Sequence, residues 1–373
     1  MANTNFAALT SEELTLWQRS VWKEARNKSF MSRISGKSDN AICQRITELK
    51  KDEKGARCVI TLVNELSGDG VTGDNILEEN EEAMLSDDDV IQLDQLRHAT
   101  RSAGEMAEQR SVVNFRNQAK DKLSYWIADR MDQMAFLTLA GISYTLKNNG
   151  GTRPVLAAGR NLSNLAFAAD VSAPSSERHV RWSNATGDLV AGDTTAMVAA
   201  DKINYDALVL IKSLMKERYI RPLMGDEGEE VYAVFMPPRA LAQLKLDADF
   251  KANLREAMPR SGGNPIFKGA GSYYIDGLVI TEHRHVFNTL GATAPNKWGA
   301  AGDVDGCRIS VCGAQSLAFA DIGMAKWKEK SFDYDNQPGI SVGKIMGFKK
   351  PTLDTSYSTG KQDFGVMSFD VAL

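Results

Sequence analysis

The sequence predicts an α+β protein in which long extended elements are attached to a compact α/β unit. Three observations support this prediction. A helical periodicity without proline runs from Glu105 to about Gly141, and short amphipathic helices alternate with strand-like segments after residue 201. Between two strand-like segments lies ELSGDGVTGDNILEENEEAMLSDDD, residues 65–89, an acidic stretch that is too long for a tight hairpin turn.

The composition is that of a globular protein, with 373 residues, 43% hydrophobic and 25% charged. The apolar run that begins at Met134 is too short to span a bilayer, and the N-terminus lacks the features of a signal peptide. We therefore expect a soluble protein, and its net charge of −4 argues against a protein that coats nucleic acid. Cys43, Cys58, Cys307 and Cys312 form no CxxC pair, which predicts buried free thiols. The last two lie five apart in a strand and point to opposite faces.

The N-terminal region begins with a short helix. Thr10 and Glu13 match a capping box, and the helix that follows carries Trp17 and Trp22. Two roles are open for these tryptophans: packing on their own domain, or docking on a neighbouring subunit, since interface anchors are often Trp. The sequence that follows is polar and weakly periodic, so residues 1–56 are expected to form an N-terminal arm.

Residues 57–100 are predicted to form a long hairpin. RCVITLVNEL, residues 57–66, reads as one strand and VIQLDQLRHA, residues 90–99, as its return. Residues 61–95 contain eleven acidic residues and no Lys or Arg, so this segment should extend into solvent or toward a basic partner. Residues 1–60 carry eleven Lys and Arg against seven Asp and Glu. They are the expected partner, in the same chain or in a neighbouring copy.

The helix predicted to begin at Glu105 is the longest element of the chain. Its length up to Leu139 would be roughly 50 Å, which suits a spine on which other elements are mounted. Residues 142–200 are rich in turn signals and predict a loop-bearing insertion. We assign residues 101–200 to one domain that contains the spine helix and the insertion.

Residues 201–326 predict a compact α/β unit. VYAVFM, residues 231–236, reads as a buried strand, and Pro238 can open the next helix as its first residue. Residues 327–373 are β-rich and end in apolar residues, which predicts a C-terminus tied into a sheet.

The sequence predicts no catalytic, cofactor or metal site. The glycine- and aspartate-rich stretch lacks the lysine of a phosphate loop and the spacing of a calcium loop, although Asp69, Asp74 and Glu78 could bind a cation. His283 and His285 have a spacing that can ligate a metal, but no third ligand lies nearby in the sequence. The preferred interpretation is a histidine pair at a strand end.

Six segments carry a resemblance to a known family, and they occur in order along the chain. They are ISGKSDNAICQRITELKK (34–51), LVNELSGDGVTGD (62–74), LEENEEAM (77–84), IQLDQLRHATRSAGEMAEQR (91–110), FDYDNQPG (332–339) and FGVMSFD (364–370).

With these segments the chain resembles the tailed-bacteriophage major capsid proteins of the Hong Kong 97-type fold, in the N-four-like podovirus branch. The resemblance implies an N-terminal arm, an extended loop hairpin, a peripheral domain with a long spine helix and an axial α/β domain from residue 201. A C-terminal β-rich segment, residues 327–373, would return to the peripheral domain. The implied function is structural: self-assembly as hexamers and pentamers into an icosahedral head around double-stranded DNA.

The implied partners are copies of the same chain, a portal and a separate scaffolding protein, with a decoration protein as an open option. We expect a separate scaffold because the sequence starts directly with the arm. Contact with packaged DNA would be weak and non-specific, with no cofactor and no membrane. The chain would be assembled in the cytoplasm of the bacterial host and would end in the virion capsid.

In this arrangement the extended loop lies over an adjacent subunit, where its carboxylates face basic residues. The residues expected in these contacts are Gly68, Asp69, Gly70, Gly73, Asp74, Glu78, Glu79, Glu81 and Glu82 in the loop, and Trp17, Trp22, Arg33, Lys37, Lys50 and Lys51 in the arm.

Three alternatives remain open at this point. The first is an encapsulin-like nanocompartment shell of the same fold, which encloses a cargo protein. The second is an enzyme that uses the acidic loop with His283 and His285. The third is a protein that coats nucleic acid, which would bind DNA with a steep salt dependence.

Overall fold

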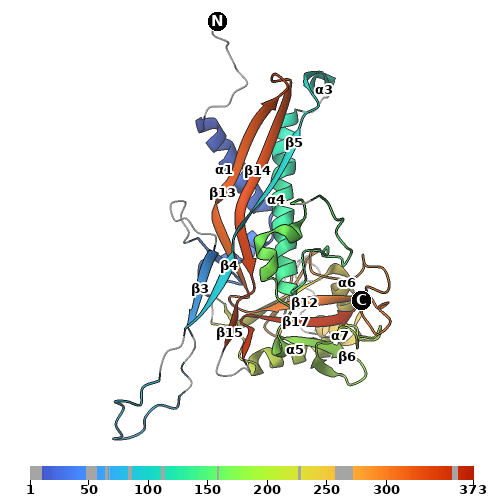
Figure 1. Ribbon diagram of the computed structural model, residues 1–373. Coiled ribbons are helices and arrows are strands. Elements are labelled where there is room, and N and C mark those ends of the chain that lie inside the picture. Colours follow the sequence, from blue (N-terminus) through green and yellow to red (C-terminus); the bar gives the residue numbers. More distant parts are fainter. Residues whose placement is uncertain are drawn as a thin grey trace.

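The computed structural model describes residues 11–47, 57–63, 66, 68–82, 86–110, 114–157, 159–225, 228–256, 272–354 and 360–373. Figure 1 shows an elongated molecule in which a long shaft stands on a wider base, and a loop leaves the body at the lower left. None of the helices within these ranges is both long and apolar enough to cross a bilayer.

The shaft is a five-stranded sheet with the strand order β1-β2-β13-β14-β5, and two helices lie along it (Figure 1). Its centre is the long antiparallel hairpin of β13 and β14, against which α1 and α4 pack. The elements are α1 (Ser11–Lys28), α2 (Met31–Ile34), β1 (Ser35–Gly36), β2 (Cys43–Ile46), β5 (Asp94–Arg101), α4 (Phe115–Ala140), β13 (Leu317–Phe332) and β14 (Gln337–Lys349).

The predicted spine helix is interrupted. It consists of α3 (Glu105–Arg110) and the 26-residue α4, so the long helix spans about 39 Å rather than 50 Å. The side chain of Asn114 accepts a hydrogen bond from the backbone N–H of Asn117 and caps a new helix start. Gly141, with φ of 65°, ends α4 in the left-handed conformation.

The base is an eight-stranded sheet with the order β10-β11-β9-β12-β17-β6-β7, in which β8 also pairs with β9. The predicted buried strand and the helix opened by Pro238 are confirmed, and the C-terminus lies in this sheet. The elements are β6 (His179–Ser183), β7 (Asp188–Ala191), α5 (Tyr205–Glu217), β8 (Leu223–Met224), β9 (Glu230–Met236), α6 (Pro238–Leu246), α7 (Ala248–Glu256), β10 (Ser272–Ile275), β11 (Leu278–Glu282), β12 (Gly306–Cys312) and β17 (Val366–Ala372).

Two hydrophobic cores meet at β12. Cys307, Ile309 and Val311 belong to the core under α5 and α6, whereas Cys312 belongs to the core shared with α4. The two cysteines of this strand therefore point to opposite faces, as predicted. All four cysteines are buried free thiols, which confirms the prediction from their spacing.

The base draws its strands from three separate parts of the chain. β6 and β7 precede the expected division at residue 201, yet they extend this sheet through a parallel pairing of β6 with β17. β17 comes from the C-terminal segment and lies at the centre of the base, whereas β13 and β14 belong to the shaft. The insertion read as loop-rich is therefore partly a sheet extension; its other elements are the 3-10 turns Leu162–Asn164, Ala166–Asp170 and Ser176–Arg178.

The predicted hairpin is confirmed as β3 (Arg57–Val63) paired antiparallel with β4 (Ser86–Gln92). The return strand begins earlier than expected, and the chain then passes directly into β5 of the shaft. The hairpin packs on the shaft through a small core that includes Cys58, Ile60 and Ile91. The remaining strands, β15 (Thr352–Asp354) and β16 (Lys361–Asp363), form a separate pair.

Candidate inter-subunit surfaces

The acidic loop, defined here as residues 66–82, lies outside the body of the molecule (Figure 1). Its conformation is maintained by short local bonds. The amide of Gly68 donates to Glu82 Oε2 at 2.7 Å, and the side chains of Asn75 and Asn80 donate to the carbonyls of Thr72 and Ile76. Such turns shape the loop without attaching it to the rest of the subunit.

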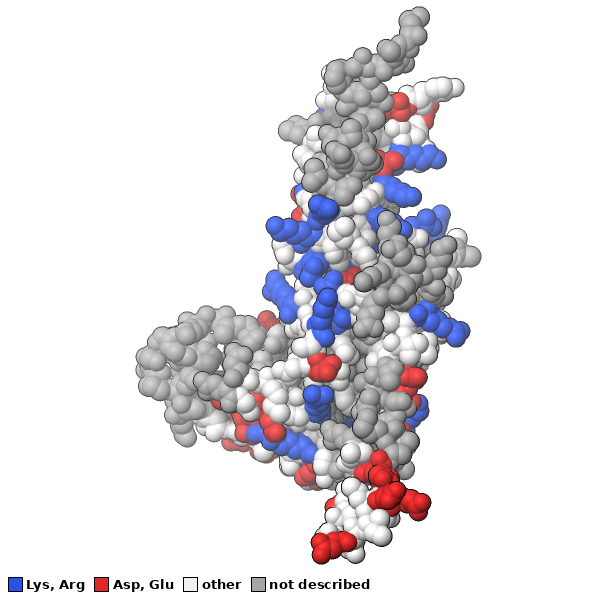
Figure 2. Space-filling model, turned by 90° about the vertical axis from the view of Figure 1, so that its left-hand side faces the viewer, with Lys and Arg blue, Asp and Glu red and all other residues white. Residues whose placement is uncertain are grey.

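The charged and apolar side chains of the loop tip are exposed. Ile76 is 72% exposed and Leu77 is 59% exposed, although both are large apolar residues. Figure 2 shows acidic side chains at the lower end of the molecule, while Lys and Arg gather along the shaft above. Among the described residues, no ion pair involves the loop carboxylates Asp69, Asp74, Glu78, Glu79 or Glu81.

Among the described residues, the expected basic partner forms no ion pair with the loop within one chain. Arg33 and Lys37 are exposed, and neither forms an ion pair with a described loop carboxylate. Lys50 and Lys51 lie outside the described residues. Instead of projecting as an arm, the segment around β2 lies along β13 in a parallel pairing, and Arg45 pairs with Asp321 there.

Of the two tryptophans of α1, the structure describes the side chain of Trp22 but not that of Trp17. Trp22 is only 6% exposed, and the ammonium of the buried Lys344 lies 3.9 Å from its ring centroid. Of the two roles left open by the sequence, Trp22 therefore shows packing on its own chain. Trp17 lies on the same helix, but its side chain is outside the described part, as is Thr10 of the predicted capping box.

A groove of about 1480 Å³ lies between β5, α4 and the chain from residue 147 to residue 165. This surface, called the basic groove below, was not found from the sequence. Its only acidic residue among the described lining residues is Asp94. Its cations are Arg97, Arg130, Lys147, Arg153, Arg160 and Arg284, with His98 and His285 beside them.

Three of these cations have no charged partner in the subunit. Arg97, Lys147 and Arg160 are exposed and form no ion pair with any residue that the structure describes. Burial lowers the pKa of Arg153, and the charge of nearby Arg130 lowers this pKa further. The basic groove is therefore a site of uncompensated positive charge.

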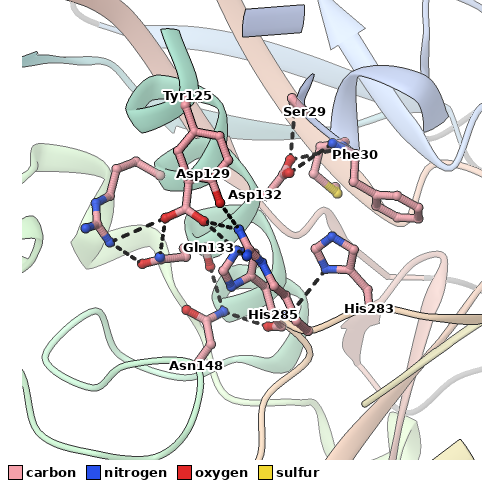
Figure 3. Close-up of polar contacts among 12 residues, drawn as sticks. Ser29, Phe30, Tyr125, Asp129, Asp132, Gln133, Asn148, His283 and His285 are labelled. Carbon is pink, nitrogen blue, oxygen red and sulfur yellow. Dashed lines mark hydrogen bonds and ion pairs between the residues drawn. The ribbon is translucent and has the colours of Figure 1, made fainter. Parts of the chain in front are cut away.

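The predicted histidine pair lies at the end of β11, where three segments meet (Figure 3). His285 Nε2 is 2.9 Å from Asp129 Oδ1 on α4, and Arg284 forms an ion pair of 2.7 Å with the same oxygen. The ring of His283 packs against those of Phe30 and Phe136, with centroid distances of 4.6 and 4.7 Å. The pair thus joins α4 to the base.

Asp132 anchors the N-terminal segment to the same part of α4. Its carboxylate accepts hydrogen bonds from Ser29 Oγ at 2.7 Å and from the amides of Phe30 and Met31 (Figure 3). Burial raises the pKa of Asp132 despite these bonds, and burial also lowers the pKa of His283 to about 4. The hydrogen bond from His285 lowers the pKa of Asp129.

This polar junction is a structural link. The acidic partner of His285 is Asp129 rather than a loop carboxylate, so the structure does not combine the acidic loop and the histidines into one site. Within the described ranges, no group of three or more His, Cys, Asp and Glu side chains is placed to hold a metal ion.

Comparisons with known proteins agree with this geometry. A model of the phage capsid protein family matches residues 5–373. The major capsid protein of Pseudomonas phage KPP25 is 53% identical over 371 residues, which cover 99% of this chain and 97% of that protein. The capsid of Ralstonia phage GP4 matches with a TM-score of 0.72 at 25% identity, over 92% of this chain and 90% of that chain. The cyanophage Pam1 capsid matches with a TM-score of 0.68 at 20% identity, over 100% and 96%.

The mixed α+β architecture is thus that of a capsid subunit of the Hong Kong 97 type. The chain belongs to the phage capsid protein family. It is a major capsid protein, a structural component of the icosahedral head of a tailed phage and not an enzyme. This finding excludes the enzyme and nucleic-acid-coating alternatives, and it favours a phage head over a nanocompartment shell.

Proposed function

We propose that this subunit assembles as hexamers and pentamers, and that the acidic loop is the extended loop that lies over a neighbouring subunit. The observation that carries the proposal is the state of the loop. Its carboxylates Asp69, Asp74, Glu78, Glu79 and Glu81 have no ion-pair partner among the described residues, and Ile76 and Leu77 are exposed at its tip. A self-repelling segment with exposed apolar side chains is favourable only if another molecule covers it.

The energetics of such a contact combine two contributions. Each exposed ion pair stabilises by less than about 1 kcal/mol, so charges mainly set orientation and register between subunits. Burial of apolar side chains such as Ile76 and Leu77 supplies about 1.5–3 kcal/mol each when complete. Because the contact is repeated across the whole shell, modest individual terms give a stable closed particle.

The proposal extends to the domains of the subunit and to its partners. The shaft corresponds to the peripheral domain and the base to the axial domain, with Arg33, Lys37, Lys50, Lys51 and Trp17 of the arm in further inter-subunit contacts. The partners are a separate scaffolding protein and a portal, with a decoration protein as an open option, and the packaged double-stranded DNA is contacted weakly. The sequence segments quoted above support an assignment of the chain to the N-four-like branch.

The proposal is tested by removing the acidic loop from the chain in cells that make all other head proteins. Because Val63 pairs with Ser86, replacing residues 64–85 with Asn-Gly closes the β3–β4 hairpin through a two-residue turn. We expect a folded subunit that forms no closed heads. A matched control keeps the loop length but replaces its Asp and Glu residues with Asn and Gln. Closed heads of normal size from the loop-deleted chain would contradict the proposal.

A further inference from the structure

We infer that the basic groove receives the acidic loop of a second copy of this chain. The inference rests on the proposed function, since it names the surface on which the extended loop of the neighbour lies. The sequence suggested the N-terminal segment as the basic partner of the loop, whereas this inference assigns that role to the basic groove.

The acidic loop and the basic groove carry opposite charges. The loop carboxylates Asp74, Glu78 and Glu79 have no ion-pair partner in the described part of their own subunit, and the groove cations Arg97, Lys147 and Arg160 have none either. By contrast, part of the N-terminal positive charge is already used, because Lys28 pairs with Glu24 and Arg45 with Asp321. Other N-terminal cations, such as Arg19, Lys23 and Arg33, also form no ion pair among the described residues, but they are spaced along the chain, whereas the groove gathers its cations around one hollow.

The basic groove also offers apolar side chains beside its cations. Leu156 lines the groove and is 49% exposed, and the adjacent Val155 is 91% exposed. The half-buried Trp126 also contributes to the lining. These side chains give Ile76 and Leu77 of a loop an apolar surface to contact beside the cations, which a purely electrostatic site would lack.

The loop of the same chain lies far from its own basic groove. In Figure 1 the loop leaves the body at the lower left, below β3 and β4, whereas the groove lies higher in the molecule, beside β5 and α4. A hairpin of residues 64–85 can reach at most about 35 Å. Its described residues 68–82 point away from the shaft (Figure 1). The occupant is thus the loop of a neighbouring copy rather than that of the same chain.

A second macromolecule could use the same cations, namely the phosphate backbone of DNA. The exposed Val155 and Leu156 at the groove favour a mixed acidic and apolar peptide over a phosphate backbone, which has no apolar side chains to cover them. DNA binding is therefore treated as an outcome of the tests rather than as the proposal.

Engineered cysteines test the contact directly in heads produced by the full-length chain. The native thiols do not interfere, because they are buried and burial raises the pKa of Cys43 and Cys312 to about 12. In the double variant Glu78→Cys/Arg160→Cys, mild oxidation should convert most of the chains to disulfide-linked oligomers on a non-reducing gel.

The matched control is Glu78→Cys/Arg239→Cys, in which the second cysteine lies at the exposed start of α6 on the base. The control should remain monomeric on the same gel. Heads that form normally but show no more cross-linking in the groove pair than in the control would overturn the inference, while leaving the proposed role of the loop intact.

Charge exchange supplies an independent readout. The variant Arg97→Glu/Lys147→Glu/Arg160→Glu should lower the yield of closed heads at least about tenfold, because each loop would face like charge. Adding Asp74→Lys/Glu78→Lys/Glu79→Lys should restore heads. Thermal unfolding of the isolated subunits checks that each variant is folded.

Two results of the exchange would contradict the inference. Normal heads with a normal DNA content from the groove variant would show that the groove is not an assembly surface. Normal heads with a reduced DNA content would assign the groove to the phosphate backbone. Failure of the loop-deleted chain in assembly, together with either result, would support the proposed function and reject only this inference.

Discussion

The acidic loop and the polar junction at the end of β11 use the same residue types in opposite ways. At the junction, Asp129 pairs with His285 and Arg284, and Asp132 accepts three hydrogen bonds from the N-terminal segment. In the loop, carboxylates such as Asp74 are exposed and lack an ion-pair partner in the described part of the chain. Charge that is paired inside the subunit stabilises its fold, and charge that is unpaired outside is available to a neighbouring copy.

The comparison predicts that variants in the paired regions change subunit stability, whereas variants in the loop change assembly. The largest effect is expected at the buried ion pair of Lys350 and Asp363, whose side chains are each 1% exposed and lie 2.8 Å apart. Lys350→Met leaves a buried carboxylate without its cation and should cost about 3–5 kcal/mol of unfolding free energy. Urea denaturation of the unassembled subunit measures this loss.

The control for this prediction is the double variant Lys350→Met/Asp363→Asn, which removes both charges. It should recover part of the lost stability, because no uncompensated charge remains buried. Equal stability of Lys350→Met and the unaltered chain would show that the pair contributes nothing.

The second effect is a dependence of subunit stability on pH. The pKa of His283 is lowered to about 4, mainly by burial. Between about pH 6.5 and pH 4, His283 therefore binds a proton in the unfolded chain but stays neutral in the folded chain. Stability should therefore fall as the pH drops from 6.5 to 4. The lowered pKa of His283 corresponds to a loss of about 3 kcal/mol in unfolding free energy at low pH. Because the ring is partly exposed, we expect a loss of about 2 kcal/mol.

The matched variant for the pH dependence is His283→Phe, which keeps a ring packed against Phe30 and Phe136. It should flatten the stability profile between pH 6.5 and pH 4, because Asp129, whose pKa is lowered, loses its contribution to stability only below about pH 4. An unchanged slope in His283→Phe would assign the pH dependence to other groups.

The third effect concerns the start of α4. Asn114→Ala removes the side chain that caps the amide of Asn117, and it should destabilise the subunit by about 1 kcal/mol. Asn114→Ser retains a capping oxygen and should be close to neutral. Thermal unfolding compares the two variants, and equal losses would mean that the cap is not the reason for the helix start.

The smallest effect on the subunit is expected in the loop itself. Asp74→Asn/Glu78→Gln/Glu79→Gln should change the unfolding free energy by less than about 0.5 kcal/mol, because these side chains have no ion-pair partner in the described subunit. The same variant should lower the yield of closed heads. A large loss of subunit stability would show that the loop carboxylates act within their own chain, and the comparison would fail.

Local patterns allowed much of the fold to be predicted. The alternating and apolar segments identified β3, β4 and β9, and Pro238 marked a helix start because a missing N–H costs nothing there. Asn114 carried a capping signal, but the apolar periodicity on both sides of it suggested one helix. Strand pairings such as β6 with β17 depend on long-range packing, which periodicity does not encode.

The surfaces were predictable only in part. The acidic loop is one continuous segment, so its charge is visible in the sequence. The basic groove gathers Arg97, Lys147 and Arg160 from separate segments, and no single stretch of sequence shows the cluster. The same limit applies to Trp22, whose burial depends on its contact with Lys344, a residue far away in the chain.

The central claim, that the loop acts between copies, is tested most directly by electron cryomicroscopy of the assembled head at side-chain resolution. The account predicts density for residues 68–82 across a neighbouring subunit, with Glu78 within ion-pair distance of a groove cation of that neighbour. Density showing the loop folded back against its own subunit, with the basic groove of every copy unoccupied by protein, would contradict it.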